Sequence, residues 1–296
     1  MNKEAEAVYS PRIQTGWKYF FCKLFSEKLV AAGVIVLLIM TFVAVFAQII
    51  SPHNPLGVDI SSRLLPPSQA HPLGTDDVGR DIFSRIIFGA RISLETGLLV
   101  ALGSMGLGTL VGLVTGYWGG IFDHIVMRVF DALMAFPGIL LAIGIMAVLG
   151  PNSMNVVVAL IVAFIPSFTR LVRGSVLSVK ENTYIESARS LGLTDAEILF
   201  RHVLPNCLAP ILVQVTIIFV FAIRAEASLS FLGLGTPVPQ PSWGNILAEG
   251  RNYLRDAPWI SIFSGLAIAI TILSLNILGD ALRDIIDPRM RGKGGD

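Results

Sequence analysis

Residues 184–205, YIESARSLGLTDAEILFRHVLP, form a polar stretch between two long apolar runs of the chain. Two capping boxes, in which a Thr hydroxyl and a Glu carboxylate satisfy free backbone donors, are indicated here. Thr183 and Glu186 have the required spacing, and Thr194 and Glu197 repeat it. This pattern predicts that two short helices begin near these threonines.

A sharp turn is expected between the two helices at Gly192. A helix end often needs a residue that tolerates a positive φ, and glycine does so without a steric penalty. Pro205 closes the stretch, and because proline lacks a backbone N–H it suits the first turn of a following helix. The stretch therefore predicts a helix, a turn, a second helix and then entry into the next apolar segment.

The composition is that of a membrane protein. Hydrophobic residues make up 53% of the 296 residues, charged residues only 15%, and the mean hydropathy is +0.71. Soluble domains carry about 25% charged residues. This apolar composition makes membrane lipid the expected surrounding. The net charge of +1 gives no reason to expect nucleic acid as a partner. Cys22 and Cys207 are expected to be packing residues and not a disulfide.

We expect an all-α polytopic membrane protein with six transmembrane helices. The apolar runs are 29–50, 92–117, 129–149, 156–171, 206–234 and 259–279. The first run has 22 residues, enough to cross about 30 Å of hydrocarbon at about 1.5 Å per residue. A cleaved signal peptide is the alternative, since Val45-Phe46-Ala47 resembles a cleavage site, but the run exceeds the usual h-region of about 7–15 residues.

The basic residues predict that both termini are cytoplasmic. This topology makes residues 1–28 a cytoplasmic tail with an interfacial helix, 51–91 an extracytoplasmic loop, 92–279 the core with five spans, and 280–296 a cytoplasmic tail. The loop 174–205 then also lies in the cytoplasm. Inner segments hold 15 Lys and Arg residues and outer segments hold 6, with one more, Arg224, inside a span. This excess agrees with the positive-inside rule.

Proline and small residues indicate how the spans pack. Ser104, Gly108, Gly112 and Gly116 follow one another at intervals of four, so they share a helix face and let a second helix approach closely. Pro137, Pro166 and Pro210 lie within spans, and we expect them to kink these helices without ending them. Residues 123–128 are expected to form a short polar turn.

An acidic string, LGTDDVGRD at residues 73–81, stands in the expected outer loop. Thr75 is a plausible N-cap, and Asp76 and Asp77 suit the positive end of a helix. Asp81 and Arg85 have the i,i+4 spacing of an ion pair. Metal binding by the three aspartates is a less favoured reading, because a metal site usually needs more converging ligands.

Two charges, Arg224 and Glu226, lie inside the fifth span. Charges within a span are expected to serve a function, here in a translocation path across the membrane or at an interface with a second subunit. Residues two apart do not share a helix face, so each is expected to meet a different partner. Two alternatives remain: both side chains reach the outer headgroups, or the charges serve an ion-coupled secondary transporter.

No motif for catalysis is present in the sequence. It lacks the Gly-x-x-x-x-Gly-Lys-Ser/Thr loop that binds phosphates and has no plausible nucleophile–base pair. The four histidines, His53, His71, His124 and His202, are scattered, so no histidine or cysteine cluster and no bound metal is expected. A membrane-embedded enzyme is therefore disfavoured.

The polar stretch resembles the EAA motif of ABC importer permeases. The residues that carry the resemblance are Glu186, Ser187, Ala188, Leu191, Gly192, His202, Leu204 and Pro205, with Ser187 in place of the family's first Ala. In that family the loop couples the permease to an ATPase subunit. The resemblance implies that these eight residues contact the ATPase and that ATP and Mg²⁺ bind to partner subunits, with no cofactor on this chain.

The resemblance covers most of the chain. The acidic string, SLSFLGLG at residues 228–235 and GDALRDIIDP at residues 279–288 resemble the C-type permease of dipeptide, oligopeptide, glutathione and nickel importers. It implies a bacterial cytoplasmic membrane protein that works with a B-type permease, two ATPase subunits and an extracytoplasmic binding protein. Thr75, Asp76, Asp77, Gly79, Arg80 and Asp81 are expected to serve the outer gate or the binding protein. Peptide is the expected substrate, and a nickel or metal chelate is the alternative.

Overall fold

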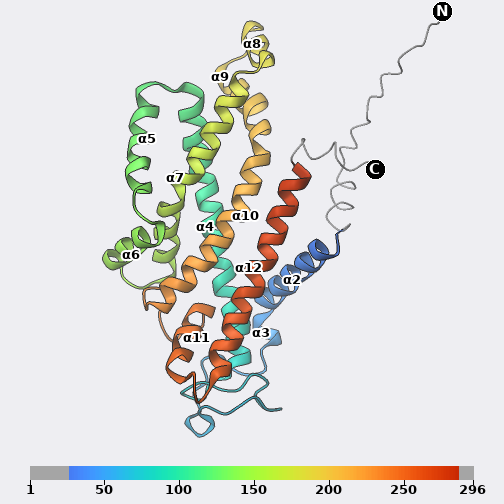
Figure 1. The fold of residues 1–296 in the computed structure, drawn as a ribbon, viewed down its shortest axis with the longest axis vertical. Helices are drawn as coiled ribbons and strands as arrows, with labels where there is room; N and C mark the ends of the chain where they lie inside the picture. Colours follow the sequence, from blue (N-terminus) through green and yellow to red (C-terminus); the bar gives the residue numbers. More distant parts are fainter. Residues whose placement is uncertain (1–26, 287–296) are drawn as a thin grey trace, which may run out of the picture.

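The structure is a computed structural model that describes residues 27–286. Within this range the protein is helical (Figure 1). The helices are α2 (Lys28–Val45), α3 (Ala47–Ile50), α4 (Ile82–Trp118), α5 (Gly120–Met134), α6 (Gly138–Leu149), α7 (Ser153–Lys180), α8 (Thr183–Ser190), α9 (Asp195–Ile198), α10 (Leu204–Phe231), α11 (Trp243–Gly250) and α12 (Pro258–Ile286). Five helices are long and apolar enough to cross a membrane, or six spans result if α5 and α6 are counted together.

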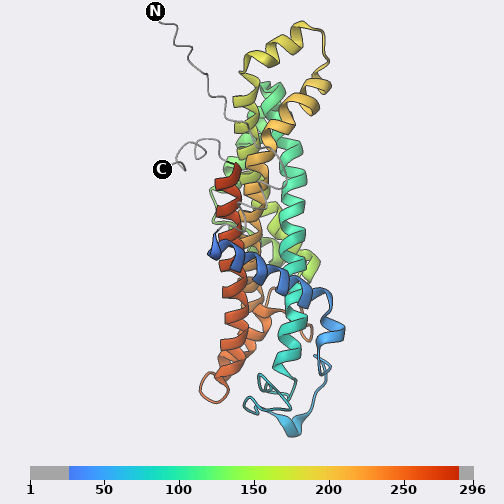
Figure 2. The same cartoon turned by 90° about the vertical axis from the view of Figure 1, so that its right-hand side faces the viewer.

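The long helices α4, α7, α10 and α12 run along the long axis of the molecule (Figure 1). Helices α8 and α9 stand at one end of this bundle, and α11 and the loop that precedes α4 lie at the other end (Figure 1). Helix α2 crosses the bundle obliquely and packs on α12 and α4 (Figure 2). The largest buried apolar cluster joins α4, α7 and α10 and includes Val100, Phe168, Val172 and Ile218.

Small residues make the contact between α4 and α7 close. Ser104, Gly108, Gly112 and Gly116 are all buried on α4. A Cβ atom added to Gly112 would lie 2.7 Å from the Cβ atom of Val172 and 2.9 Å from the carbonyl oxygen of Thr169. The expected packing face therefore lies against α7, where glycine allows the two backbones to approach.

The expected span at 129–149 is not one continuous helix: α5 and α6 meet at an angle of 91° and together form either one broken span or a re-entrant loop. Helix α5 ends at Met134, and Pro137 is the N-cap of α6. Proline disfavours helical backbone at the preceding residue, so the chain breaks here and does not merely kink. Pro166 and Pro210 do lie inside helices, α7 and α10, as expected.

The expected polar turn at 123–128 is also wrong, since these residues belong to α5. Its acidic residue Asp123 accepts two hydrogen bonds of 2.6 Å from the guanidinium of Arg173 on α7. This bidentate pair satisfies the charge within the helix bundle, so the polar side chain does not require a turn.

Helix α4 begins at Ile82, ten residues before the expected span, because Asp81 caps it.

The two expected capping boxes have different outcomes. The box at Thr194 and Glu197 is formed. Thr183 is the first residue of α8 and does not cap it, since the N-cap is Asn182, whose side chain makes no capping hydrogen bond to α8. The interfacial helix expected in 1–28, with Cys22, and the end of the 280–296 tail lie outside the described residues, while Cys207 is buried in α10.

Candidate functional site

A helical hairpin projects from one end of the bundle and consists of α8, the turn at Gly192 and α9 (Figure 1). Gly192 has a φ of +81°, as its place between two helices predicts. Leu191, beside it at the turn, has 81% of its surface exposed. Ile185 and Ala188 are buried beneath the hairpin. The hairpin is therefore packed on its inner side and carries an exposed leucine at its tip.

Most residues of the motif face outward. Glu186, Ser187, Leu191, Gly192 and Pro205 are exposed, His202 and Leu204 are half-buried, and Ala188 is buried. Ala188 packs in the large apolar cluster, so its small size serves the attachment of the hairpin. The exposed residues form the surface that another protein can contact.

Tyr117, near the end of α4, holds the hairpin to the bundle. Its hydroxyl donates a hydrogen bond of 2.7 Å to a carboxylate oxygen of Asp195 on α9. The ammonium group of Lys180 donates to the carbonyl oxygen of Tyr117 at 2.5 Å and lies 5.5 Å from the centre of its ring. Arg189 on α8 also reaches the tyrosine hydroxyl, which raises the pKa of the arginine.

Sequence reasoning missed Tyr117. The tyrosine and Asp195 are 78 positions apart, and no sequence motif indicates that these two residues lie in contact. The contact arises because α4 ends beside the start of α9. Its only sequence signal is a tyrosine at the end of a span, which more often indicates a membrane interface.

An ion cluster at the opposite end joins the loop before α4 to α11. Arg85, fully buried, lies with one Nη atom 2.5 Å from both Asp76 and Glu249. Arg80 donates to Asp76 at 2.6 Å and to Glu249 at 3.1 Å. Two arginines thus face two carboxylates, and this arrangement fixes the loop before α4 and the first turn of α4 to α11, which is distant in the sequence.

Two expectations about this loop are wrong. Thr75 does not cap α4: its hydroxyl donates to the carbonyl oxygen of Ser62 at 2.5 Å. Asp81 does not pair with Arg85, because its carboxylate caps α4 by accepting from the backbone and hydroxyl of Ser84 at 2.8 and 2.7 Å. Arg85 instead points to Asp76, which the i,i+4 spacing could not indicate.

The turn at Gly79 explains why the loop is compact. Gly79 has a φ of +81°, and a Cβ atom added there would lie 1.7 Å from the carbonyl oxygen of Asp59. Only glycine therefore fits between these two parts of the loop.

The loop also orders its own polar side chains. Hydrogen bonds from the hydroxyls of Ser61 and Ser62 lower the pKa of the Asp59 carboxyl. Within the acidic string Asp77 is half-buried, as are Leu73 and Val78, while Thr75, Asp76, Gly79, Arg80 and Asp81 are buried.

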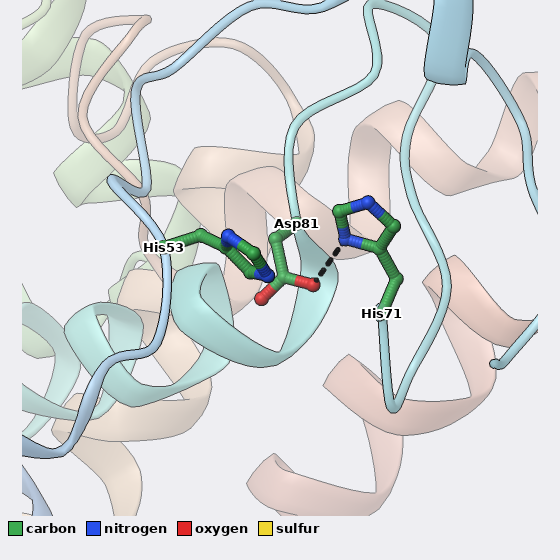
Figure 3. Close-up of side chains that lie close together, drawn as sticks. All are labelled: His53, His71 and Asp81. Atoms are coloured by element: carbon green, nitrogen blue, oxygen red, sulfur yellow. Dashed lines mark hydrogen bonds and ion pairs between the residues drawn. The ribbon is translucent and has the colours of Figure 1, made fainter. Parts of the chain in front are cut away.

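Two groups of side chains at this end have atoms close enough to hold a cation. One is Asp76, Asp77 and Glu249, where Arg80 and Arg85 already form close ion pairs with Asp76 and Glu249. The other is His53, His71 and Asp81 (Figure 3). The expectation that all four histidines are scattered is therefore wrong, because the rings of His53 and His71 have centres 4.9 Å apart.

Arg224 and Glu226 take different directions on α10. Glu226 is 1% exposed and accepts hydrogen bonds from the hydroxyls of Ser230 at 2.8 Å and Ser93 on α4 at 3.3 Å. Arg224 is exposed, and its guanidinium lies 5.6 Å from the ring centre of Phe221. The two charges therefore meet different partners, as expected. The alternative that both reach the headgroups is wrong for Glu226.

A helical bundle with five or six candidate spans among its described residues, and with a polar hairpin standing at one end, has the architecture of a multi-pass membrane protein. The chain belongs to the family described as "Binding-protein-dependent transport system inner membrane component", which matches residues 108–292. Residues 15–67 match the "N-terminal TM domain of oligopeptide transport permease C". The protein is thus a permease of a bacterial ABC importer, a transport component that is not itself catalytic, and the secondary-transporter alternative is not supported.

Similar proteins are named as transport system permeases. The chain is 49% identical over 262 residues, 88% of each chain, to a putative peptide transport system permease protein of Brucella suis. It is 42% identical over 275 residues to the dipeptide transport system permease protein DppC of Alkalihalophilus pseudofirmus, covering 93% of this chain and 90% of the relative. It is 47% identical over 281 residues to the glutathione transport system permease protein GsiD of Pectobacterium atrosepticum, covering 94% and 93%.

A solved structure shares the fold. A chain of the methionine ABC transporter MetNI, in an inward-facing conformation, superposes with a TM-score of 0.57. The match covers 70% of this chain and 98% of that chain at 18% sequence identity. The likeness therefore supports the permease fold of the bundle.

Proposed function

We propose that this permease imports peptides, either di- or oligopeptides or a glutathione-like peptide. The support is the similarity to relatives whose names specify peptide, dipeptide and glutathione transport. A nickel or metal-chelate substrate is the second candidate, which the sequence resemblance leaves open. Uptake of a labelled dipeptide, in competition with glutathione and with a nickel chelate, separates these substrates. Competition by the chelate alone would contradict the proposal.

We further propose that the hairpin of α8 and α9 docks on an ATPase subunit that binds ATP and Mg²⁺. The observation that carries this is the exposed Leu191 at the bend of an otherwise well-anchored hairpin. An apolar side chain at 81% exposure favours a partner groove, since its burial there removes apolar surface from water. The anchor between Tyr117 and Asp195 gives the docked partner a firm connection to α4.

In the proposed assembly the hairpin and both termini face the cytoplasm. The opposite end, with the acidic string and α11, then faces the extracytoplasmic binding protein. A second, B-type permease completes the pathway across the cytoplasmic membrane. Because Asp76, Arg80 and Arg85 are buried in the ion cluster, their proposed role is to shape the outer gate, while Asp77 is accessible to a binding protein.

Glu226 is proposed to serve the translocation path or the contact between permeases. Its carboxyl lies buried between α4 and α10, where hydroxyls of Ser93 and Ser230 satisfy it. Arg224 is exposed on the same helix and is available to a second permease. A buried acid that joins two spans can change its bonds when these spans move.

Substitution of Gly192 tests the docking proposal. Valine at a positive φ costs about 1–2 kcal/mol, so Gly192→Val is expected to distort the bend and to abolish peptide uptake while ATP hydrolysis becomes independent of substrate. No atom lies within 4 Å of a Cβ added here, so the effect is conformational and not a clash. Gly192→Asn is the matched control, because asparagine tolerates this conformation. Normal uptake in a well-expressed Gly192→Val complex would refute the proposal.

A further inference from the structure

The cluster of His53, His71 and Asp81 brings together three segments at the end of the bundle that carries α11 (Figure 3). His53 follows α3, His71 lies in the loop before α4, and Asp81 is the N-cap of α4. The ring of His53 and the ring of His71 lie on either side of the Asp81 carboxylate (Figure 3). One ligand atom from each of the three lies within 4.8 Å of the others.

We propose that these three side chains bind a divalent transition-metal ion. Two imidazole nitrogens and one carboxylate oxygen suit Zn²⁺, Ni²⁺ or Cu²⁺, whereas Mg²⁺ and Ca²⁺ require mostly oxygen ligands. Nδ1 of His71 lies 2.9 Å from Oδ1 of Asp81. Since each ligand of zinc lies about 2.0–2.2 Å from the ion, two of its ligands are roughly 3–4 Å apart. This hydrogen-bonded pair lies slightly closer than that, so it opens by less than about 1 Å when the ion takes the place of the shared proton.

The third ligand requires only a small movement. His53 is exposed, and its ring can turn toward the ion once the 2.9 Å hydrogen bond from its Nε2 to the carbonyl oxygen of Ala70 is given up. The ligand atoms of the three side chains lie within 4.8 Å of one another, which exceeds the usual distance between two ligands of one ion by about 1 Å at most. A rotation of the His53 side chain supplies this movement. Three protein ligands leave at least one coordination position for water, so the ion exchanges with solution.

Hydrogen bonds from neighbouring groups orient the ligands, as such bonds commonly do in metal sites. Oδ2 of Asp81 accepts from the backbone and hydroxyl of Ser84, which directs Oδ1 toward His71. The same hydroxyl accepts a hydrogen bond of 3.2 Å from the backbone of His53. The backbone of His71 donates to the hydroxyl of Ser68 at 3.1 Å. The bound ion therefore joins the end of α3, the outer loop and the start of α4.

The test is zinc binding to the full chain, purified in detergent with an affinity tag that contains no histidine. After removal of metal with a chelator, ZnCl₂ is titrated against a chromophoric competitor. One equivalent is expected to bind to the wild type. His53→Ala and His71→Ala are each expected to weaken binding by more than the roughly 10–100-fold that loss of an outer-shell group costs. His124→Ala and His202→Ala are the matched controls, since these histidines lie outside the cluster, and they are expected to bind as the wild type does.

A second measurement separates ligand loss from misfolding. Asp81→Asn keeps an oxygen that accepts from Ser84 and so retains the helix cap, but it removes the charge. Zinc is expected to raise the thermal unfolding temperature of the wild type and of both control variants, and to leave that of Asp81→Asn unchanged. The proposal is overturned if the wild type binds no zinc, if His53→Ala or His71→Ala binds zinc as tightly as His124→Ala does, or if zinc stabilises Asp81→Asn equally.

Discussion

Substitution of Gly112 by alanine measures how much the close contact of α4 and α7 contributes to stability. The added methyl group would lie 2.7 Å from the Cβ atom of Val172 and 2.9 Å from the carbonyl oxygen of Thr169. The carbonyl belongs to the backbone of α7, so it cannot rotate away and the helices must separate. Overpacking of this kind costs about 1–3 kcal/mol. Part of this cost is offset by the better helix propensity of alanine, worth up to about 1 kcal/mol.

Gly106→Ala is the matched control on the same helix. No atom lies within 4 Å of a Cβ added at Gly106, so this variant gains helix propensity without a clash. Unfolding in mixed micelles with increasing SDS, followed by tryptophan fluorescence, gives the free energy of unfolding of both variants. We expect Gly112→Ala to be less stable than Gly106→Ala by about 1–3 kcal/mol. Equal stability, or a more stable Gly112→Ala, would refute the close packing of α4 and α7.

The other predictions concern the ion cluster, the topology and Glu226. Glu249→Gln leaves the buried Arg85 with one carboxylate, so we expect the free energy of unfolding to fall by up to about 3–5 kcal/mol in the same assay. The control Glu95→Gln changes an exposed side chain and should not lower it. Equal stability of the two variants would exclude a stabilising cluster. A cysteine at Asp77 should react with a membrane-impermeant thiol reagent added outside cells and one at Asp195 should not, and the reverse result would overturn the proposed topology. Glu226→Gln should assemble with the ATPases but lose uptake, whereas wild-type uptake in this variant and in Arg224→Met would remove both residues from the transport function.

The features that the sequence predicted well depend on residues close in the chain. The turn at Gly192 and the capping box at Thr194 follow from a glycine or a Thr–Glu spacing of three. The small-residue face of α4 follows from one helix period, although the sequence could not identify α7 as its partner. The helical membrane class follows from composition alone.

The features that the sequence did not predict depend on how the helices pack. Arg85 and Glu249 meet although they are 164 positions apart, because α11 folds back against the start of α4. From the sequence, Pro137 could either kink a helix or end it. In the structure a new helix, α6, begins after Pro137, and α5 packs on α7 through the ion pair of Asp123 with Arg173. Thr75 stands where a cap is plausible, but the nearby carbonyl oxygen of Ser62 binds its hydroxyl.

Helix α4 has a further consequence because of its length. Its 37 residues extend for about 55 Å at about 1.5 Å per residue. Tyr117 fastens one end to the hairpin, and Asp81 and Arg85 fasten the other end to the loop and to α11. The glycine contacts along its middle hold α7 close against it. We therefore expect that a displacement of the hairpin tilts α4, and that this tilt reaches the loop and α11 at the other end of the bundle.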